Sequence, residues 1–372
     1  MPSRWEEFKK SMQPTIREFR FMLYRMSRSP LSVAGVAIIV FFVIIAVLAP
    51  VLAPPQGSDP FMIPYDDVLR SRPIHGNLAP VPPCKGHPFG TVFEQYDIYY
   101  GCIWGTINAF RIGILVVAAA LISGIIIGTI AGYYGGLVDE ILMRFTDIIF
   151  AFPGLILAMA LVTVIRDRQP VDLTLLATIV MAVVFVIVAT RRVKVHYKIL
   201  AGAIFVAFLI LTFYHPIVTT FHFNRLDKVL LALVLIGWPG YARLIRGEVM
   251  RIRNEDFVEA AKAIGCSDLR VIVKHVLPNT IYPVLVVATL DTGSIVLTAA
   301  ALSFLGIGAP SGYADWGWMI SLSREWIGTG TMLVNYFHAF MIPGIFIFTF
   351  VLGWNLLGDA FRDILDPMLR RR

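Results

Sequence analysis

Long apolar runs without charge constrain this chain more than any other feature. A helix needs about 20 apolar residues to cross the ~30 Å hydrocarbon core of a bilayer. Eight candidate runs occur, at residues 31–53, 112–133, 146–165, 173–190, 199–214, 229–245, 281–308 and 338–357. Only 15% of the residues are charged, against about 25% in soluble domains. The sequence predicts an all-α polytopic membrane protein and excludes a soluble enzyme, a disordered tail or a disulfide scaffold.

The distribution of Lys and Arg predicts how these spans are oriented. With the N-terminus inside and eight spans, most basic residues fall in cytoplasmic segments, which is the usual bias of membrane proteins. Both termini are therefore expected in the cytoplasm. The runs 173–190 and 199–214 are short, and removing both preserves this orientation, so six spans remain an alternative. These basic inner segments account for the net charge of +7, and no nucleic acid is expected as a partner.

The same pattern divides the chain into segments. Residues 31–53 are read as a transmembrane anchor rather than a cleaved signal peptide, because no small-residue cleavage site follows them. The expected divisions are a basic cytoplasmic segment at 1–30, the anchor at 31–53, a Pro- and Gly-rich extracytoplasmic loop at 54–111, a transmembrane domain at 112–358, and a basic cytoplasmic tail at 359–372.

Catalytic motifs are missing from the sequence. The phosphate-binding pattern GxxxxGK[ST], the zinc pattern HExxH and the nucleophile pattern GxSxG do not occur. The seven histidines are scattered, and none is expected to bind a metal. The chain is therefore not expected to be an enzyme, and any uphill transport would draw its energy from an ion gradient or from a partner ATPase.

The polar stretch between the sixth and seventh runs, residues 248–279, predicts two short helices joined by a glycine. Gly265 ends the first helix in a conformation with positive φ, Ser267 or Asp268 caps the second, and Pro278 ends it. Apolar faces are expected at Phe257, Ala260, Ala261 and Ile264 in the first helix and at Leu269, Ile272, Val273 and Val276 in the second. Such an elbow suits docking into a groove of a partner, but packing on its own bundle is equally consistent with the pattern.

Other residues stand out inside the predicted spans and outer segments. Gly124, Gly128 and Gly132 recur every four residues, a spacing that lets two helices approach closely in lipid. Asp291 lies within the seventh run, where a carboxylate either lines a pathway or bonds to a neighbouring helix.

The outer segments carry cysteines and tryptophans. Cys84 and Cys102 either form a disulfide in an oxidising compartment or remain two free thiols. The second outer segment, residues 309–337, has an interfacial composition with its three tryptophans, Trp316, Trp318 and Trp326.

The elbow resembles the EAA loop of ABC-transporter permeases. The matching positions are Glu259, Ala260, Ala261, Gly265, Leu277 and Pro278, and His275 stands where the general pattern has Ile, as in the peptide/nickel branch. The likeness continues in family order through residues 26–55, 131–136, 237–243, 301–306 and 355–359. On these residues the chain is similar to the C-type (DppC/OppC-like) permease of the dipeptide/oligopeptide/nickel importer family.

The resemblance implies a fold and a role. The fold is a six-span type I permease core with an insertion at 166–228 that carries the two short spans, and the coupling loop is residues 247–280. The implied partners are a second, B-type permease, two ABC ATPase subunits that bind ATP and magnesium, and an extracytoplasmic binding protein. No cofactor or metal is expected on this chain itself, which would lie in the cell membrane of a prokaryote.

The sequence leaves alternatives open for both the substrate and the energy source. Peptides lead, while oligosaccharides or nickel remain open within the same class, because the binding protein selects the substrate. An ion-gradient-driven secondary transporter is the alternative from another class; it would show inverted repeats and paired broken helices, and the sequence has no internal repeat.

Overall fold

The computed structural model of the 372-residue chain describes residues 24, 26–66, 79–165, 168–172, 202–208, 218–324 and 336–365. The predicted span 173–190 lies outside these residues. Of the span 199–214 only the helical residues 202–208 are described. The described residues therefore do not test the number of spans, and eight remains a prediction.

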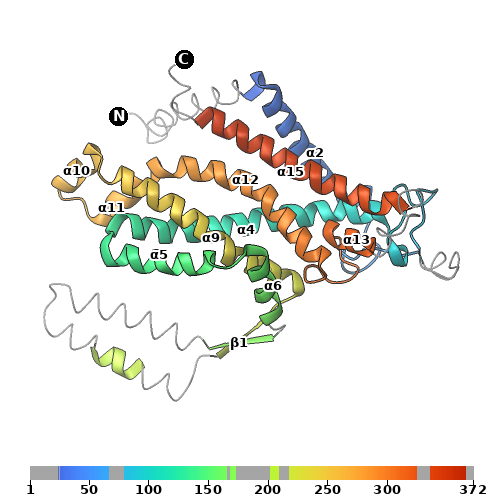
Figure 1. The fold of residues 1–372 in the computed structure, drawn as a ribbon, viewed down its shortest axis with the longest axis horizontal. Coiled ribbons are helices and arrows are strands. Elements are labelled where there is room, and N and C mark those ends of the chain that lie inside the picture. Colours follow the sequence, from blue (N-terminus) through green and yellow to red (C-terminus); the bar gives the residue numbers. More distant parts are fainter. Residues whose placement is uncertain are drawn as a thin grey trace, which may run out of the picture. The chain divides into compact units, whose positions relative to one another are not determined.

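Five helices in the described part are long and apolar enough to cross a membrane. They are α2 (Pro30–Leu52), α4 (Ile98–Tyr134), α9 (Arg225–Ile252), α12 (Leu277–Phe304) and α15 (Phe337–Leu365). A sixth span results if the bent pair α5 (Gly136–Phe150) and α6 (Gly154–Val164) counts as one. The helical membrane fold is thus confirmed, and the ribbon in Figure 1 shows α5 running beside α4.

Helix α4 begins well before the predicted start of the second span. The carboxylate of Asp97 accepts a hydrogen bond from the backbone N–H of Tyr100 at 2.7 Å and so caps the helix at Ile98. At 37 residues, α4 is about 55 Å long. Residues 98–111, predicted as part of the outer loop, are helical, and most of them are buried although their polar and aromatic side chains lower the mean hydropathy.

The predicted third span, residues 146–165, is not one helix. Helices α5 and α6 meet at a bend of 90°. Pro153 lies at the break, where it disfavours helical backbone at the residue before it. Helix α5 itself begins earlier than predicted, directly after the turn at Gly135.

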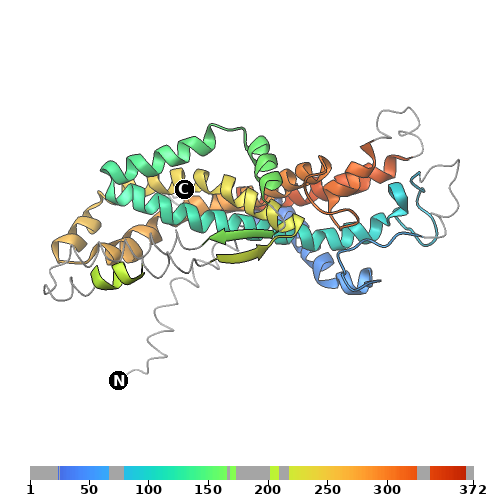
Figure 2. The same cartoon turned by 90° about the horizontal axis from the view of Figure 1, so that it is seen from below.

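The glycine stripe of α4 packs closely on another helix, as predicted, and the structure identifies that helix as α9. A methyl group at Gly124 would lie 2.3 Å from the Cβ atom of Tyr241, and one at Gly128 would lie 2.4 Å from the carbonyl oxygen of Ala242. One at Gly132 would lie 2.8 Å from the carbonyl oxygen of Arg246. Figure 2 shows the two helices side by side, as Figure 1 does.

Helix α13 (Trp316–Leu322) lies within the segment 309–337, for which the tryptophans predicted a membrane–water interface. Trp316 and Trp318 are buried, and the indole Nε1 of Trp316 donates to the carbonyl oxygen of Cys102 in α4 at 3.2 Å. Asp315 caps α13 through the N–H of Trp318 at 2.9 Å. The prediction was wrong for these two tryptophans because tertiary packing encloses them; Trp326 lies outside the described residues.

Residues 163–228 form a second compact unit, separate from the unit of residues 1–162 and 229–372. Its described part contains an antiparallel hairpin of β1 (Arg168–Asp172) and β2 (Val218–His222), with Arg168 opposite His222 and Asp172 opposite Val218. The all-α prediction did not include this hairpin. The unit covers nearly the same residues as the predicted insertion at 166–228.

The close approach of α4 and α9 gives a direct test. Gly128→Ala should lower the free energy of unfolding by about 1–3 kcal/mol, because the added methyl group meets backbone that cannot rotate away. Gly240→Ala in α9 is the matched control, since nothing lies within 4 Å of its Cβ position. Thermal unfolding of the detergent-solubilised protein measures both, and equal midpoints for the two variants would contradict this packing.

Candidate functional site

The predicted elbow is present and is built from three short elements. Helix α10 (Asp256–Ala263) is followed by the turn at Gly265, then by α11 (Asp268–Val271) and by the π-helical turn η3 (Ile272–Val276). Gly265 has φ +86°, as predicted. Its Cβ position is open, so an L-residue there would be strained by backbone conformation alone.

Pro278 does not end the second helix, contrary to the prediction. The backbone N–H of Leu277 bonds to the carbonyl oxygen of Ile272, and the chain continues through the π turn into α12. Pro278 lies in the first turn of α12, where its fixed φ is compatible with the start of a helix. The elbow is therefore continuous with a membrane span.

The elbow has two apolar faces, and only one of them packs on the bundle. The inner face is part of the core formed with α4, α9 and α12, and its buried residues are Val258, Ala261, Val271, Ile272 and Val276. The outer face consists of Phe257, Ile264, Leu269 and Val273, which we call the outer elbow face. Ile264 is 81% exposed and Leu269 is 72% exposed. The bundle thus leaves these four apolar side chains of the elbow exposed.

The residues that match the EAA pattern are distributed over both faces. Glu259 and Ala260 are exposed, and Ala261 is buried. His275 and Leu277 are partly buried, and Pro278 is exposed at the start of α12. Ser267 is the N-cap residue of α11 by its backbone, but its side chain makes no capping bond.

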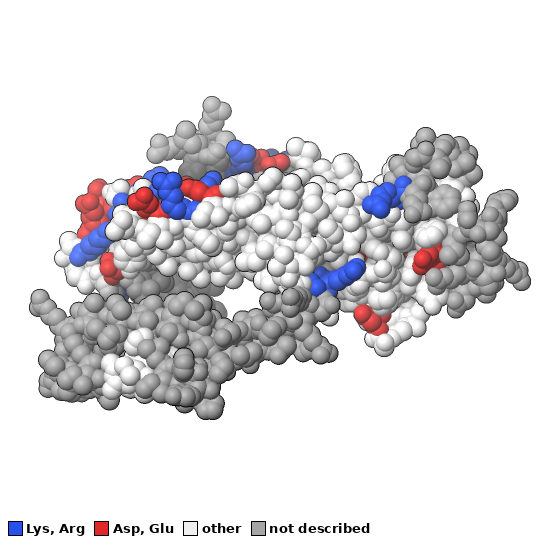
Figure 3. Space-filling view, turned by 60° about the horizontal axis from the view of Figure 1, so that its bottom comes forward, with Lys and Arg blue, Asp and Glu red and all other residues white. Residues whose placement is uncertain are grey.

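Arginine–aspartate pairs join α5 to α9 next to the elbow. Both carboxylate oxygens of Asp139 accept from the guanidinium of Arg246, and Asp147 accepts from Arg243 at 2.5 Å. The sequence does not predict these pairs, because the partners are about a hundred positions apart and only the fold brings them together. Figure 3 shows charged side chains gathered at this end and a broad uncharged surface beyond them.

Asp291 faces a neighbouring helix. Its carboxylate interacts with the hydroxyl of Tyr241 in α9 electrostatically, although that buried hydroxyl makes no hydrogen bond of normal geometry. Asp291 does not line the apolar cavity of about 390 Å³ formed by residues of α6, α9 and α12. Asp291 thus has a neighbour on another helix, and its role in a pathway stays a prediction.

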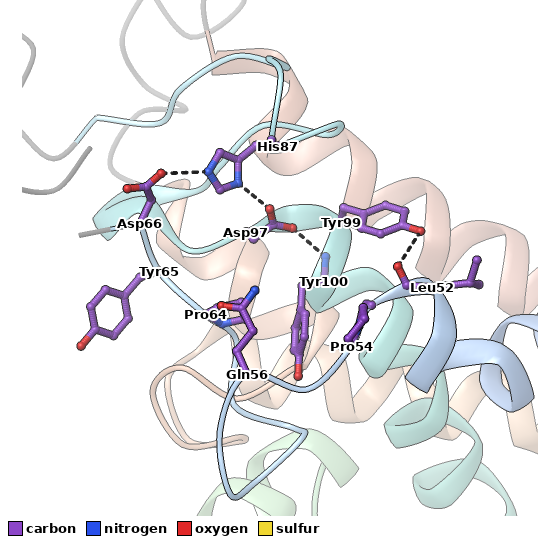
Figure 4. Close-up of a pocket in the computed structure, with 12 residues that line it drawn as sticks. Leu52, Pro54, Gln56, Pro64, Tyr65, Asp66, His87, Asp97, Tyr99 and Tyr100 are labelled. Atoms are coloured by element: carbon purple, nitrogen blue, oxygen red, sulfur yellow. Dashed lines mark hydrogen bonds and ion pairs between the residues drawn. The ribbon is translucent and has the colours of Figure 1, made fainter. Parts of the chain in front are cut away.

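A second cavity, of about 450 Å³, lies at the opposite end of the bundle from the elbow, at the start of α4 (Figure 4). The imidazole of His87 lies between two carboxylates, with Nδ1 2.5 Å from Asp97 and Nε2 3.3 Å from Asp66. Both ring nitrogens donate only in the imidazolium form. Burial lowers the pKa of His87, but the bonds to Asp97 and Asp66 outweigh it and raise that pKa above 6.5. The residues that line this cavity are Leu52, Ala53, Pro54, Gln56, Pro64, Tyr65, Asp66, Gly86, His87, Asp97, Tyr99 and Tyr100.

The disulfide between Cys84 and Cys102 is not formed. Both thiols are free, and Cys102 is fully buried within α4 while Cys84 is exposed. The packing of α4 against α13 encloses Cys102, which explains why pairing does not occur. Among the described residues, no group of three His, Cys, Asp or Glu side chains is placed to hold a metal ion.

Comparison with known proteins identifies the family. The family described as "Binding-protein-dependent transport system inner membrane component" matches residues 124–371. This chain is a member of that family. A second family, "N-terminal TM domain of oligopeptide transport permease C", matches residues 19–80.

Curated relatives match almost the whole chain. The dipeptide transport system permease protein DppC of Alkalihalophilus pseudofirmus is 30% identical, with 95% of this chain and 91% of the relative covered. The oligopeptide permease protein OppC of Bacillus subtilis is 27% identical, with 94% and 89% covered. The glutathione permease protein GsiD of Pectobacterium atrosepticum is 28% identical, with 97% and 94% covered.

Family membership establishes the general role of the chain. It is an integral protein of the cell membrane and a transport subunit rather than an enzyme. The family's transport systems contain other subunits, and ATP hydrolysis lies in those subunits. The predicted resemblance to DppC/OppC-like permeases is confirmed.

The His87 bridge predicts a pH-dependent contribution to the stability of this inner membrane component. When folding raises the pKa of a group, the group stabilises the folded state fully at pH values below its pKa in the unfolded chain. This stabilisation is lost as the pH rises through its pKa in the folded state. Wild type should therefore exceed His87→Gln in thermal midpoint by on the order of 2 °C at pH 5.5, with a smaller difference at pH 8.5. A difference that does not change with pH would contradict the bridge.

Proposed function

We propose that this chain is the C-type permease subunit of an ATP-driven peptide importer, and that its elbow is the contact with an ATPase subunit. The single observation that carries the proposal is the outer elbow face, which is apolar, exposed and located in the segment that resembles the EAA loop. In this proposal the importer also contains a B-type permease, a second ATPase subunit and an extracytoplasmic binding protein.

The chemistry of the elbow supports an ATPase as the partner. The chain has no phosphate-binding motif of its own, so ATP and magnesium would be held by the partner subunits. A short helix that presents apolar side chains suits a hydrophobic groove. Ile264 and Leu269 would enter the groove, while the exposed carboxylate of Glu259 would anchor its rim.

The orientation follows from the same assignment. ATP is available in the cytoplasm, so the elbow end would face the cytoplasm, together with both chain termini. The cavity beside His87 would then face outward, toward the binding protein. Closure of the ATPases would push on the elbow and shift the permease between inward- and outward-facing states, whose populations the substrate biases.

Relatives support peptides as the substrate class. The names of three relatives specify dipeptides, oligopeptides and glutathione, all of which contain peptide bonds. Oligosaccharides or nickel would be the alternatives within the class. A secondary transporter driven by an ion gradient would leave the outer elbow face without a partner.

Co-purification tests this assignment. The tagged chain, extracted from native membranes, should retain two ATPase subunits, and Ile264→Gln should reduce that retention about tenfold because it places an amide in an apolar contact. Leu137→Gln is the matched control, since Leu137 is similarly exposed, at 76%, but belongs to α5.

The same preparation tests the substrate class. Ligands released from the co-purified binding protein should be peptides when analysed by mass spectrometry. Oligosaccharide or nickel in their place would reassign the substrate. A chain that purifies alone and transports with a proton or sodium gradient would contradict the importer.

A further inference from the structure

Tyr133 lies where helix α4 meets the elbow. It is the penultimate residue of α4 and is only 8% exposed. The stretch 131–136 was noted for its resemblance to permeases, but that resemblance gives Tyr133 no role. Its contacts reach both short helices of the elbow.

The side chain of Tyr133 bridges the two sides of the Gly265 turn. Its hydroxyl donates a hydrogen bond to Oδ1 of Asp268 in α11 at 2.7 Å. The ammonium Nζ of Lys262, in α10, lies 5.2 Å from the centre of its ring, within the range of a cation–π contact. One ring thus contacts residues three positions before and three positions after Gly265.

The backbone of the same α4 end is held by a third element. Nη1 of Arg253, just after α9, donates to the carbonyl oxygens of Gly132 at 2.9 Å and of Tyr133 at 3.2 Å. These carbonyls lie in the last turn of α4, where helix carbonyls lack intrahelical partners. The C-terminus of α4 is therefore fixed to α9 by its backbone and to the elbow by its side chain.

Helix α4 runs without a break from this end to the Asp97 cap beside the second cavity. A displacement imposed on Tyr133 would therefore be carried along a single rigid helix. We propose that Tyr133 is the positioning residue through which the elbow moves α4. This inference rests on the proposed function, in which the elbow receives the motion of an ATPase subunit.

Tyr133→Phe isolates the link with little disturbance of packing. It removes only the hydroxyl that bonds to Asp268 and keeps the ring beneath Lys262. Asp268→Asn weakens the same bond from the opposite side. Tyr134→Phe is the matched control, because Tyr134 is 56% exposed and touches Tyr133 only edge-on, with ring centres 5.3 Å apart.

The experiment is amide hydrogen exchange on the complete importer, without nucleotide and with Mg-ATP plus vanadate. In wild type, nucleotide should change exchange both in the elbow, residues 256–276, and at the α4 end, residues 129–134. In Tyr133→Phe the elbow should still respond, while the response at the α4 end should fall about fivefold, the factor that one hydrogen bond of typical strength supplies. Asp268→Asn should behave alike, and Tyr134→Phe should resemble wild type.

The outcomes separate the two proposals. An unchanged response to nucleotide at the α4 end in Tyr133→Phe would overturn the role of Tyr133. The role would also be overturned if the substitution altered exchange at the α4 end equally with and without nucleotide, because the contact would then be merely structural. A wild-type elbow that does not respond to nucleotide would contradict the docking of the ATPase and leave the Tyr133 link without an input.

Discussion

The close approach of α4 and α9 is the constraint on which the main bundle depends. Lipid tails are as apolar as the side chains of a span, so helices in a membrane gain little from burial and associate through tight packing and polar contacts. Gly124, Gly128 and Gly132 supply that packing, since a Cβ atom at any of them would overlap α9. The Asp139–Arg246 pair then joins α9 to α5 at the end where the elbow begins. The packing of α4 on α9 and the Asp139–Arg246 pair thus fix the position from which the elbow extends.

The elbow converts this packing into an interaction surface. Its inner residues belong to the hydrophobic core, whereas its outer residues remain exposed in the described part of the chain. The positive φ of Gly265 turns the backbone between the two short helices, and the π turn joins the second one to α12 without a break. A force on the outer elbow face would therefore reach α12 through the backbone, and in our proposal α4 through Tyr133.

Sequence patterns predicted what depends on local chemistry. The spans near residues 31–53, 229–245 and 338–357 follow from apolar run length, and the turn at Gly265 follows from the conformational freedom of glycine. Hydropathy did not indicate that residues 98–111 continue helix α4, because their polar side chains lower it although most of these residues are buried. Run length alone also missed the bend at Pro153. The partners of Tyr133 could not be found from sequence, because Asp268 is far away along the chain and only folding brings the two together.

Site-specific photocrosslinking in native membranes tests the central claim, that the outer elbow face contacts an ATPase subunit. A photoreactive amino acid at Leu269 should give an adduct with an ATP-binding subunit, whereas the same group at Val51, which is 75% exposed on α2, should not. Mass spectrometry of the adduct identifies the partner. Crosslinks from Leu269 only to lipid or to this chain itself would contradict the account.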